Sequence, residues 1–174
     1  MEFFKNILFV TAFFAFSNPV ELEKKNILDN KVEILMPKGW KTMSEEMIQK
    51  KYPGVRPPKI VYSDITGSIS LAFNHTESKA SPEMLEKYKE VLKSSLVAAY
   101  PDAVWEEEGI KEINGKKAGV FRVITEAIDD KIYNYMVFTD LDGKLLICSF
   151  NCVEKKLKTW KPVAEQIMNS LTLK

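Results

Sequence analysis

Four apolar-rich segments joined by short turns fill residues 103–152, and this run constrains the fold more than any other part of the chain. The segments are residues 103–113, 116–128, 131–139 and 144–152. The first turn is Asn114-Gly115, a strong signal for a two-residue hairpin because both residues must adopt positive φ. Asp129-Asp130 and the stretch from Asp140 to Gly143 supply the other turns. The pattern predicts an antiparallel meander of four strands.

The last three of these strands are expected to be apolar on both faces. In the final one, residues on one side alternate with residues on the other, namely Leu145 and Ile147 against Leu146, Cys148 and Phe150. A strand that is apolar on both faces is covered on both faces. The meander is therefore expected to form the middle layer of the molecule.

Two amphipathic segments can supply the outer layers. The first opens on Ser81-Pro82, which favours a helix start, and Tyr100-Pro101 ends it. The second is the C-terminal segment that contains Leu157, Trp160, Ala164, Ile167 and Leu171 at helical spacing. Pro162 fits there only if the regular helix begins near a Thr159 cap. We expect these two helices to pack on opposite sides of the sheet.

The region before residue 80 adds shorter elements. A strand is predicted at Val32–Met36, a short helix behind a Ser44 cap, and two strands at 59–63 and 67–75. The last strand alternates, with Ile69, Leu71 and Phe73 opposite Ser68, Ser70, Ala72 and Asn74, which predicts a half-exposed strand. The fold class is α+β, an α/β/α sandwich with a central antiparallel sheet. Residues 31–174 form one domain, preceded by a polar segment at 18–30.

The first 17 residues differ from the rest. They hold six of the ten phenylalanines, Lys5 lies near the N-terminus, and Ala15-Phe-Ser17 matches a small-residue cleavage pattern. The apolar run ends at Asn18-Pro19 and is short for a membrane span, which needs about 20 residues. We predict a signal peptide at 1–17, a secreted or periplasmic mature chain and no stable membrane span after cleavage. The alternative is a retained, buried helix.

No catalytic, cofactor-binding or metal-binding residues are predicted. The chain has one histidine, His75, and isolated glycines, and Cys148 and Cys152 would lie too far apart on one strand to form a disulfide. Glu106-Glu107-Glu108 should alternate between the faces of an edge strand, so the three carboxylates should not share one site. The net charge of +1 gives no support for nucleic-acid binding.

A stiff loop at 50–59 is the candidate partner surface. Tyr52, Arg56, Pro57 and Pro58 could present an aromatic ring and a guanidinium in a rigid frame. Crossover packing of the loop is the alternative interpretation. The oligomeric state is not readable from the sequence.

These elements together resemble the PsbP/Mog1-like superfamily, including its DcrB-like and DUF1795-type bacterial branches. The resemblance lies in the strand leading into Pro37-Lys-Gly-Trp40, the Ser81-Pro82 helix, the meander, and the strand Leu145–Cys152 before a helix ending in Ile167-Met-Asn-Ser-Leu171. It implies an α/β/α sandwich and a non-enzymatic binding, assembly or chaperone-like role. No functional residues of the family map onto this chain.

Three functions remain open from the sequence. The first is an exported, non-enzymatic interaction or assembly module with a protein partner. The second is a cytoplasmic adaptor or chaperone of the DUF1795 kind, which requires the N-terminal run to be retained. The third is a small-molecule binder or hydrolase that uses a cleft between sheet and helix, which requires convergent polar groups in a concave pocket.

Overall fold

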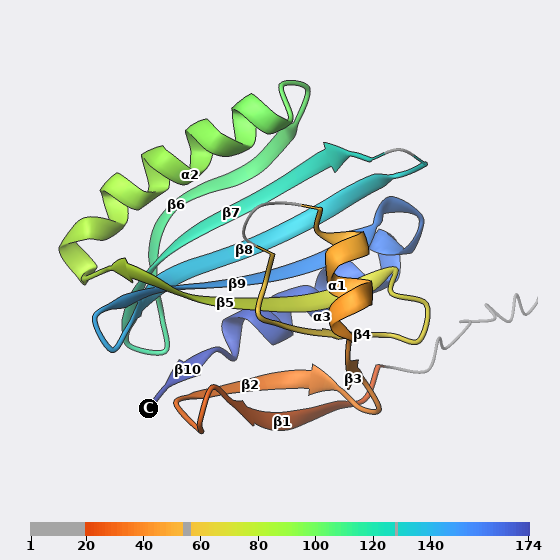
Figure 1. The fold of residues 1–174 in the computed structure, drawn as a ribbon, viewed down its shortest axis with the longest axis horizontal. Helices are drawn as coiled ribbons and strands as arrows, with labels where there is room; N and C mark the ends of the chain where they lie inside the picture. Colours follow the sequence, from red (N-terminus) through yellow and green to blue (C-terminus); the bar gives the residue numbers. More distant parts are fainter. Residues whose placement is uncertain (1–19, 54–56, 128) are drawn as a thin grey trace, which may run out of the picture.

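A seven-stranded antiparallel sheet forms the body of the molecule (Figure 1). The structure is a computed structural model that describes residues 20–53, 57–127 and 129–174, so the predicted signal peptide lies outside the described residues. In spatial order the strands are β3 (Lys41–Thr42), β4 (Ile60–Ser63), β5 (Ile69–Lys79), β9 (Lys144–Val153), β8 (Lys131–Leu141), β7 (Lys116–Glu126) and β6 (Val104–Ile113). Strands β6 to β9 are the predicted meander, which is confirmed.

The hairpin turns follow the residues that permit positive φ. Asn114 and Gly115 have φ of 47° and 77°, and Asp142 and Gly143 have φ of 52° and 71°. Both pairs join strands in direct register as two-residue loops, which suits the twist of the flanking strands. The Asn114 side chain has a second role, because its Nδ2 donates to the carbonyls of Asn169 and Leu171, each at 3.0 Å. The first hairpin thus anchors the end of the C-terminal helix.

A second, three-stranded sheet consists of β1 (Leu22–Ile27), β2 (Val32–Pro37) and β10 (Thr172–Leu173), in the order β1-β2-β10. β1 lies within the segment 18–30 that the sequence identifies as polar. Most β1 side chains are exposed or half-buried, so the strand lacks an apolar signature. Its pairing with β2, which the sequence of β1 does not reveal, provides the backbone partners.

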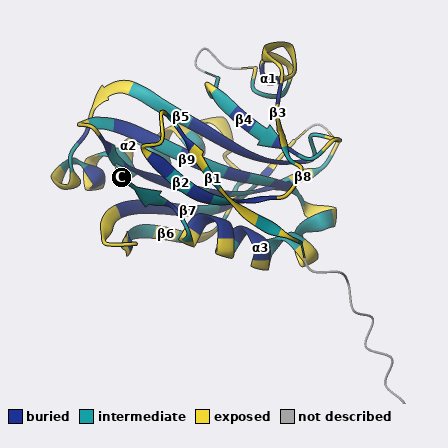
Figure 2. Cartoon of the chain, turned by 90° about the horizontal axis from the view of Figure 1, so that it is seen from below, coloured by how far each residue is buried: buried dark blue, intermediate teal, exposed yellow. Residues whose placement is uncertain are grey.

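Helices cover both faces of the large sheet, which confirms the α+β fold class. α1 (Glu45–Lys51) and α2 (Leu85–Ala99, after a 3₁₀ turn at Pro82–Met84) lie on one face. α3 (Leu157–Asn169, after a 3₁₀ turn at Glu154–Lys156) lies on the other, together with the small sheet. Figure 2 shows α1 and α3 on opposite sides of the buried central strands.

The start of α3 differs from the prediction of a Thr159 cap. The helix begins at Leu157, and Pro162 lies inside it. Proline at this position removes the hydrogen bond to the Lys158 carbonyl, but Lys158 and Pro162 are both exposed, so water can reach that carbonyl. The cost of the proline is therefore reduced at this solvent-facing position.

The central strands bury residues on both faces. Tyr133, Tyr135, Cys148 and Phe150 pack toward α3 and the small sheet, while Phe121, Phe138 and Leu145 pack toward α2. The apolar-on-both-faces prediction is confirmed, and both cysteines are buried and free.

The half-exposed strand predicted at 67–75 is wrong over Ile69–Phe73, where every residue is buried. The Ser70 and Ala72 face is covered because Ala72 packs with Met43, Ile48 and Val61 beneath α1. Small and polar side chains on this face allow a short helix to pack closely on the strand. In the sequence, however, the same side chains alternate with apolar ones and so indicate a solvent-facing side.

Candidate functional site

A cavity of about 470 Å³ opens between α1 and α2 on the sheet. Its apolar lining includes Ala72, Leu96, Val123, Ile132, Met136 and Val153. Its polar lining includes Lys51, Tyr52, Thr125, Asn134, Ser149 and Asn151. The volume lies within the roughly 300–1,000 Å³ range of small-molecule sites, and a mostly apolar wall with a few polar groups is typical of them.

A row of hydrogen-bonded polar side chains crosses the floor of this cavity. The Tyr52 hydroxyl lies 3.2 Å from Asn151 Oδ1, and Asn151 Nδ2 donates to Asn134 Oδ1 at 2.7 Å. Asn134 Nδ2 in turn donates to Thr125 Oγ1 at 3.0 Å. Asn151 and Asn134 are register partners on β9 and β8, which places their amides side by side. Between Tyr52 and Thr125 of β7, the row consists of uncharged groups.

Lys51 forms the α1 end of the row. Its Nζ donates to Ser70 Oγ at 3.0 Å and to the Gly67 carbonyl. Burial lowers the pKa of Lys51 to about 8, and the distant negative charge of Asp64 only partly opposes this effect. No carboxylate among the described residues lies within ion-pair distance of this ammonium. The cavity thus contains a poorly solvated cation whose described partners are neutral.

Lys51, Ser70 and Tyr52 also resemble a nucleophile with its base. Ser70 Oγ lies 3.0 Å from Lys51 Nζ and 3.1 Å from the Tyr52 hydroxyl, distances that a serine–lysine pair would require. However, Ser70 is 0% exposed and does not line the cavity. Attack on a carbonyl needs an exposed nucleophile with room for the substrate beside it, so this geometry supports a structural hydrogen bond rather than acyl transfer.

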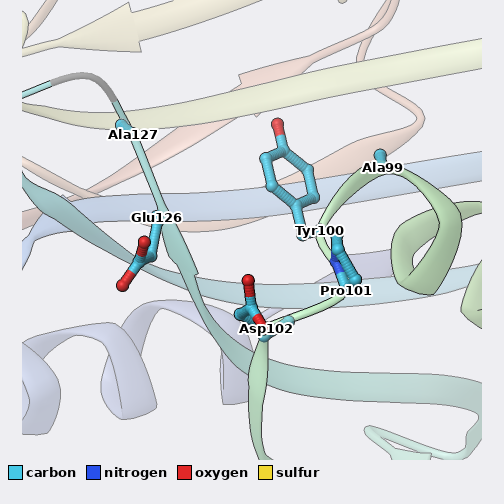
Figure 3. A pocket seen from close by; sticks show the side chains of 7 residues that line it. Ala99, Tyr100, Pro101, Asp102, Glu126 and Ala127 are labelled. Carbon is cyan, nitrogen blue, oxygen red and sulfur yellow. The ribbon is translucent and has the colours of Figure 1, made fainter.

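A second hollow of about 440 Å³ adjoins the cavity at the end of α2. The two share Tyr100, Glu126 and Ala127. Figure 3 shows Glu126 on one side of this hollow and Tyr100 on the other, with the carboxylate of Asp102 at the edge of the hollow just after Pro101. The α2 end is therefore acidic, whereas the α1 end carries Lys51.

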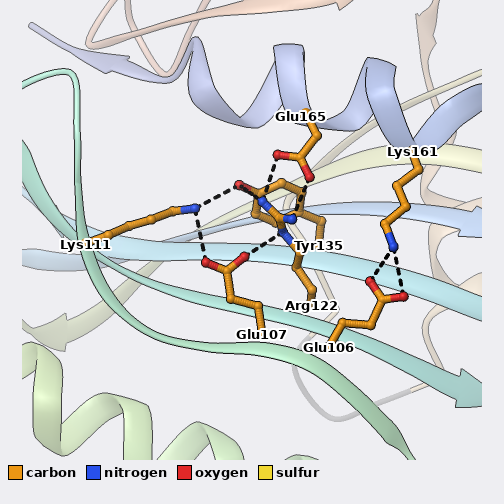
Figure 4. Close-up of polar contacts among 7 residues, drawn as sticks. All are labelled: Glu106, Glu107, Lys111, Arg122, Tyr135, Lys161 and Glu165. Carbon is orange, nitrogen blue, oxygen red and sulfur yellow. Dashed lines mark hydrogen bonds and ion pairs between the residues drawn. The ribbon is translucent and has the colours of Figure 1, made fainter.

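An ion network on the opposite face joins α3 to the sheet (Figure 4). Arg122 contacts Glu165 of α3 through Nη1 at 2.6 Å and Nη2 at 2.7 Å, and Nη2 also donates to the Tyr135 hydroxyl at 3.3 Å. Glu107 Oε2 lies 2.8 Å from Arg122 Nε, close enough for charge attraction although the N–H is not aligned for a hydrogen bond. We interpret this network as a structural one that stabilises the packing of α3 on the sheet.

The same network corrects one prediction about the acidic triplet. A β-bulge between Trp105 and Glu107 shifts the register of β6 against β7. Glu106 and Glu107 therefore both face α3, where Glu106 pairs with Lys161 at 2.7 Å, while Glu108 pairs with Lys93 of α2. Strict alternation failed because of the bulge. The three carboxylates still do not converge on one site.

The residues of the predicted partner surface do not share one location. Tyr52 and Pro58 line the cavity, Pro57 borders a separate hollow beside β5, and Arg56 lies outside the described residues. The Tyr52 ring is half-buried, and burial raises the pKa of its hydroxyl. The role of these four residues in partner binding remains a prediction.

The other candidate residues from the sequence do not form a catalytic or metal-binding site in the part of the chain that the structure describes. His75 lies on β5, and its Nε2 is 3.0 Å from the carbonyl oxygen of Leu141 at the end of β8. Across residues 20–53, 57–127 and 129–174, no group of three or more His, Cys, Asp or Glu is placed to hold a metal ion. Within the same part of the chain, no helix is long and apolar enough to cross a membrane.

Sequence reasoning missed the cavity residues Lys51, Asn134 and Asn151. The available signal was an Asn in each of two adjacent strands that are otherwise apolar on both faces. A polar residue inside such a strand must find a hydrogen-bond partner, and the register places the two opposite each other. Lys51 gave no signal, because its partners Gly67 and Ser70 are distant in sequence and come from the turn before β5 and from β5 itself.

Comparisons with known proteins show the fold. No family model and no curated protein sequence matches this chain. The structure is similar to cyanobacterial PsbP from Synechocystis sp. PCC 6803, with a TM-score of 0.66, 15% identity and coverage of 89% of this chain and 94% of that one.

Two further solved structures are similar. One is PA94, a protein of unknown function from Pseudomonas aeruginosa, with a TM-score of 0.52, 12% identity and coverage of 88% and 97%. The other, from Bacteroides thetaiotaomicron, has a TM-score of 0.55 and 10% identity, and the match covers 87% of this chain and 48% of that one. The resemblance inferred from sequence is therefore confirmed at the level of the fold: this chain has the fold of PsbP.

Proposed function

We propose that this protein is an exported, non-enzymatic binding module whose binding site is the cavity between α1 and α2. The observation that carries the proposal is the hydrogen-bonded polar row on the floor of an open, otherwise apolar cavity. Such a combination orients a ligand through polar groups while the apolar walls supply affinity. Of the three functions left open by the sequence, binding in a sheet–helix cleft is the one this geometry favours.

The non-enzymatic part of the proposal is supported by the burial of the one serine that lies beside a possible base among the described cavity residues and their partners. The serine best placed beside a base, Ser70, is fully buried, and the exposed polar groups of the floor are amides and hydroxyls that bond to one another. A hydrolase needs an accessible nucleophile, a base and a donor pair for the oxyanion.

Export rests on the first 17 residues. We expect mature protein from its native source to begin at Asn18 and to be found outside the cytoplasm. N-terminal sequencing tests this expectation. An intact Met1 on protein from the cytoplasmic fraction would favour the cytoplasmic adaptor or chaperone alternative.

Protein binding through Tyr52, Arg56, Pro57 and Pro58 is compatible with the same site. The loop that carries these residues borders the cavity through Tyr52 and Pro58. The affinity of a partner that contacts the loop should therefore depend on whether a ligand occupies the cavity. Substitution of Arg56 by Ala should weaken such a partner without affecting small-molecule binding.

Native mass spectrometry of protein purified from its own source tests the cavity directly. We expect a bound small molecule on the wild-type chain and its loss in Ser149→Phe, whose ring would occupy the floor. Ser94→Phe, on an exposed part of α2, is the matched control and should retain the ligand. If Ser149→Phe fails to fold by circular dichroism, Leu96→Trp narrows the same cavity from α2. Equal ligand content in folded cavity variants and the control would overturn the proposal.

A further inference from the structure

We infer that the α1–α2 cavity binds a monocarboxylate with an apolar body, with the carboxylate at Lys51 and the apolar body along the sheet toward β7. This inference rests on the proposed function, because it requires the cavity to be a ligand site. It adds the chemical class and the orientation of the ligand.

The unsatisfied charge of Lys51 is the first argument. An ammonium has three N–H donors, and two of them bond to the Gly67 carbonyl and to Ser70 Oγ. Neutral acceptors do not compensate a charge removed from water, whereas a carboxylate does so with a short, charge-assisted bond. Because the Lys51 ammonium has one N–H donor left and no counter-charge in the described part of the chain, the ligand group that best fits beside it is an anion. Lys51 is the one cation among the described residues that line the cavity, and a single carboxylate matches its charge better than a phosphate dianion does.

The distribution of charge around the cavity is the second argument. Lys51 contacts Ser70 of β5, whereas Glu126 ends β7, and β9 and β8 lie between these strands. An anionic group is therefore attracted to the α1 end and repelled from the α2 end, where Asp102 and Glu126 flank the adjoining hollow (Figure 3). This polarity fixes the orientation of the ligand.

The walls between these ends are the third argument. Leu96, Val123, Ile132 and Met136 line the space beside the polar row. Each methylene buried against such side chains should strengthen binding about fourfold. Ser149 lies between its register partners Ala72 of β5 and Met136 of β8 and lines the cavity. Its hydroxyl has no hydrogen-bond partner among the described residues, so a ligand can cover this part of the cavity floor. A carboxylate with an aliphatic or aromatic body matches this lining.

Isothermal titration calorimetry with simple amphiphiles, below their micellar concentrations and at pH 7, tests the inference on the full chain. The probes are octanoate, decanoate, 1-decanol and decylamine. We expect decanoate, with two more methylenes, to bind about sixteenfold more tightly than octanoate and at least tenfold more tightly than 1-decanol, with decylamine weakest. Lys51→Met should reduce decanoate affinity at least tenfold and leave 1-decanol unchanged, while Lys50→Met, on the exposed neighbour, should change neither.

The outcomes separate this inference from the proposed function. Equal binding of decanoate and 1-decanol, both abolished by Ser149→Phe, would overturn the carboxylate inference and leave the cavity as the site. Equal affinity of octanoate and decanoate would show that the chain is not buried in the cavity and that the carboxylate binds a lysine on the surface. This result would overturn the claim that the apolar body of the ligand lies in the cavity. No binding of any probe, or binding unaffected by a folded Ser149→Phe protein, would count against the proposed function as well.

Discussion

Replacing Lys51 with Met should stabilise the protein at neutral pH, which is unusual for the loss of a hydrogen-bonded side chain. Burial lowers the pKa of Lys51 to about 8 from its ordinary value of 10.5. Each pKa unit corresponds to about 1.4 kcal/mol, so complete transfer of the shift into stability would give roughly 3 kcal/mol. Because part of the side chain remains in contact with water, we expect roughly 1–2 kcal/mol.

The lost hydrogen bonds reduce this gain only slightly. Ser70 retains the Tyr52 hydroxyl as a partner at 3.1 Å, and Gly67 is accessible enough for water to replace the ammonium at its carbonyl. A methionine side chain fills the space of the lysine stem without a charge. We therefore expect Lys51→Met to raise the free energy of unfolding at pH 7 by about 1 kcal/mol.

The pH dependence identifies the cause. Between about pH 8 and pH 10.5 the unfolded wild-type chain keeps its Lys51 proton while the folded chain loses it, so wild-type stability rises with pH across this window. Asp64, Tyr52, Cys152 and the neighbouring Lys156 also influence this region, but they are present in both proteins. The difference between variant and wild type should therefore shrink from pH 7 to pH 9.5.

Urea unfolding followed by tryptophan fluorescence at pH 7 and pH 9.5 measures this difference. Lys50→Met is the matched control, because Lys50 is exposed on the same helix, and it should shift the midpoint little at either pH. A Lys51→Met protein that is less stable than wild type at pH 7, or a stability difference that is unchanged at pH 9.5, would refute the reasoning. Together with lost carboxylate binding, a stabilised variant is the pattern expected for a residue kept for function.

Three further changes test the packing. Gly119→Ala should destabilise the fold by about 3 kcal/mol or more in urea unfolding, because its Cβ would lie 1.9 Å from the Phe138 ring; wild-type stability would show that the ring can move aside. Arg122→Met should cost about 2 kcal/mol, and Glu165→Gln less, because the first leaves Glu165 without its cation and leaves Glu107 with Lys111 alone, at 3.4 Å; equal losses would contradict this. Burial raises the pKa of the Cys148 thiol, so a thiol reagent should label Cys148 only after unfolding.

The sequence predicted those elements whose signals are local. Positive-φ residues at Asn114-Gly115 fix a hairpin regardless of what packs on it, and apolar residues on both faces of β9 require cover on both sides. β1 could not be predicted in this way, because its strand character comes from pairing with β2. The bulge in β6 was also hidden, since it depends on the relative register of two strands and not on the composition of either.

The candidate site was hidden for a related reason. It is formed by residues from α1, β9, β8 and β7 that are distant in sequence, and none belongs to a catalytic motif. Ser70 and Ala72 were interpreted as a solvent-facing row, whereas α1 covers them. The sequence identified the segment at 50–59 as unusual through its prolines, but it could not show that Tyr52 points inward to Asn151.

Access to the cavity should depend on α1, which packs less extensively on the sheet than α3 does. It has seven residues, of which only Ile48 is buried, whereas α3 buries four of its residues. Elements with few buried contacts open more often, so the amides of Ile48 and Tyr52 should exchange with deuterium at least tenfold faster than those of Ile167 and Met168. Ser44→Ala removes the side-chain cap on the Met47 amide and should accelerate exchange in α1 about fivefold, with no change in α3. Equal exchange in α1 and α3 would mean that α1 does not open separately from the core, and a ligand would then have to enter from the α2 end beside Tyr100.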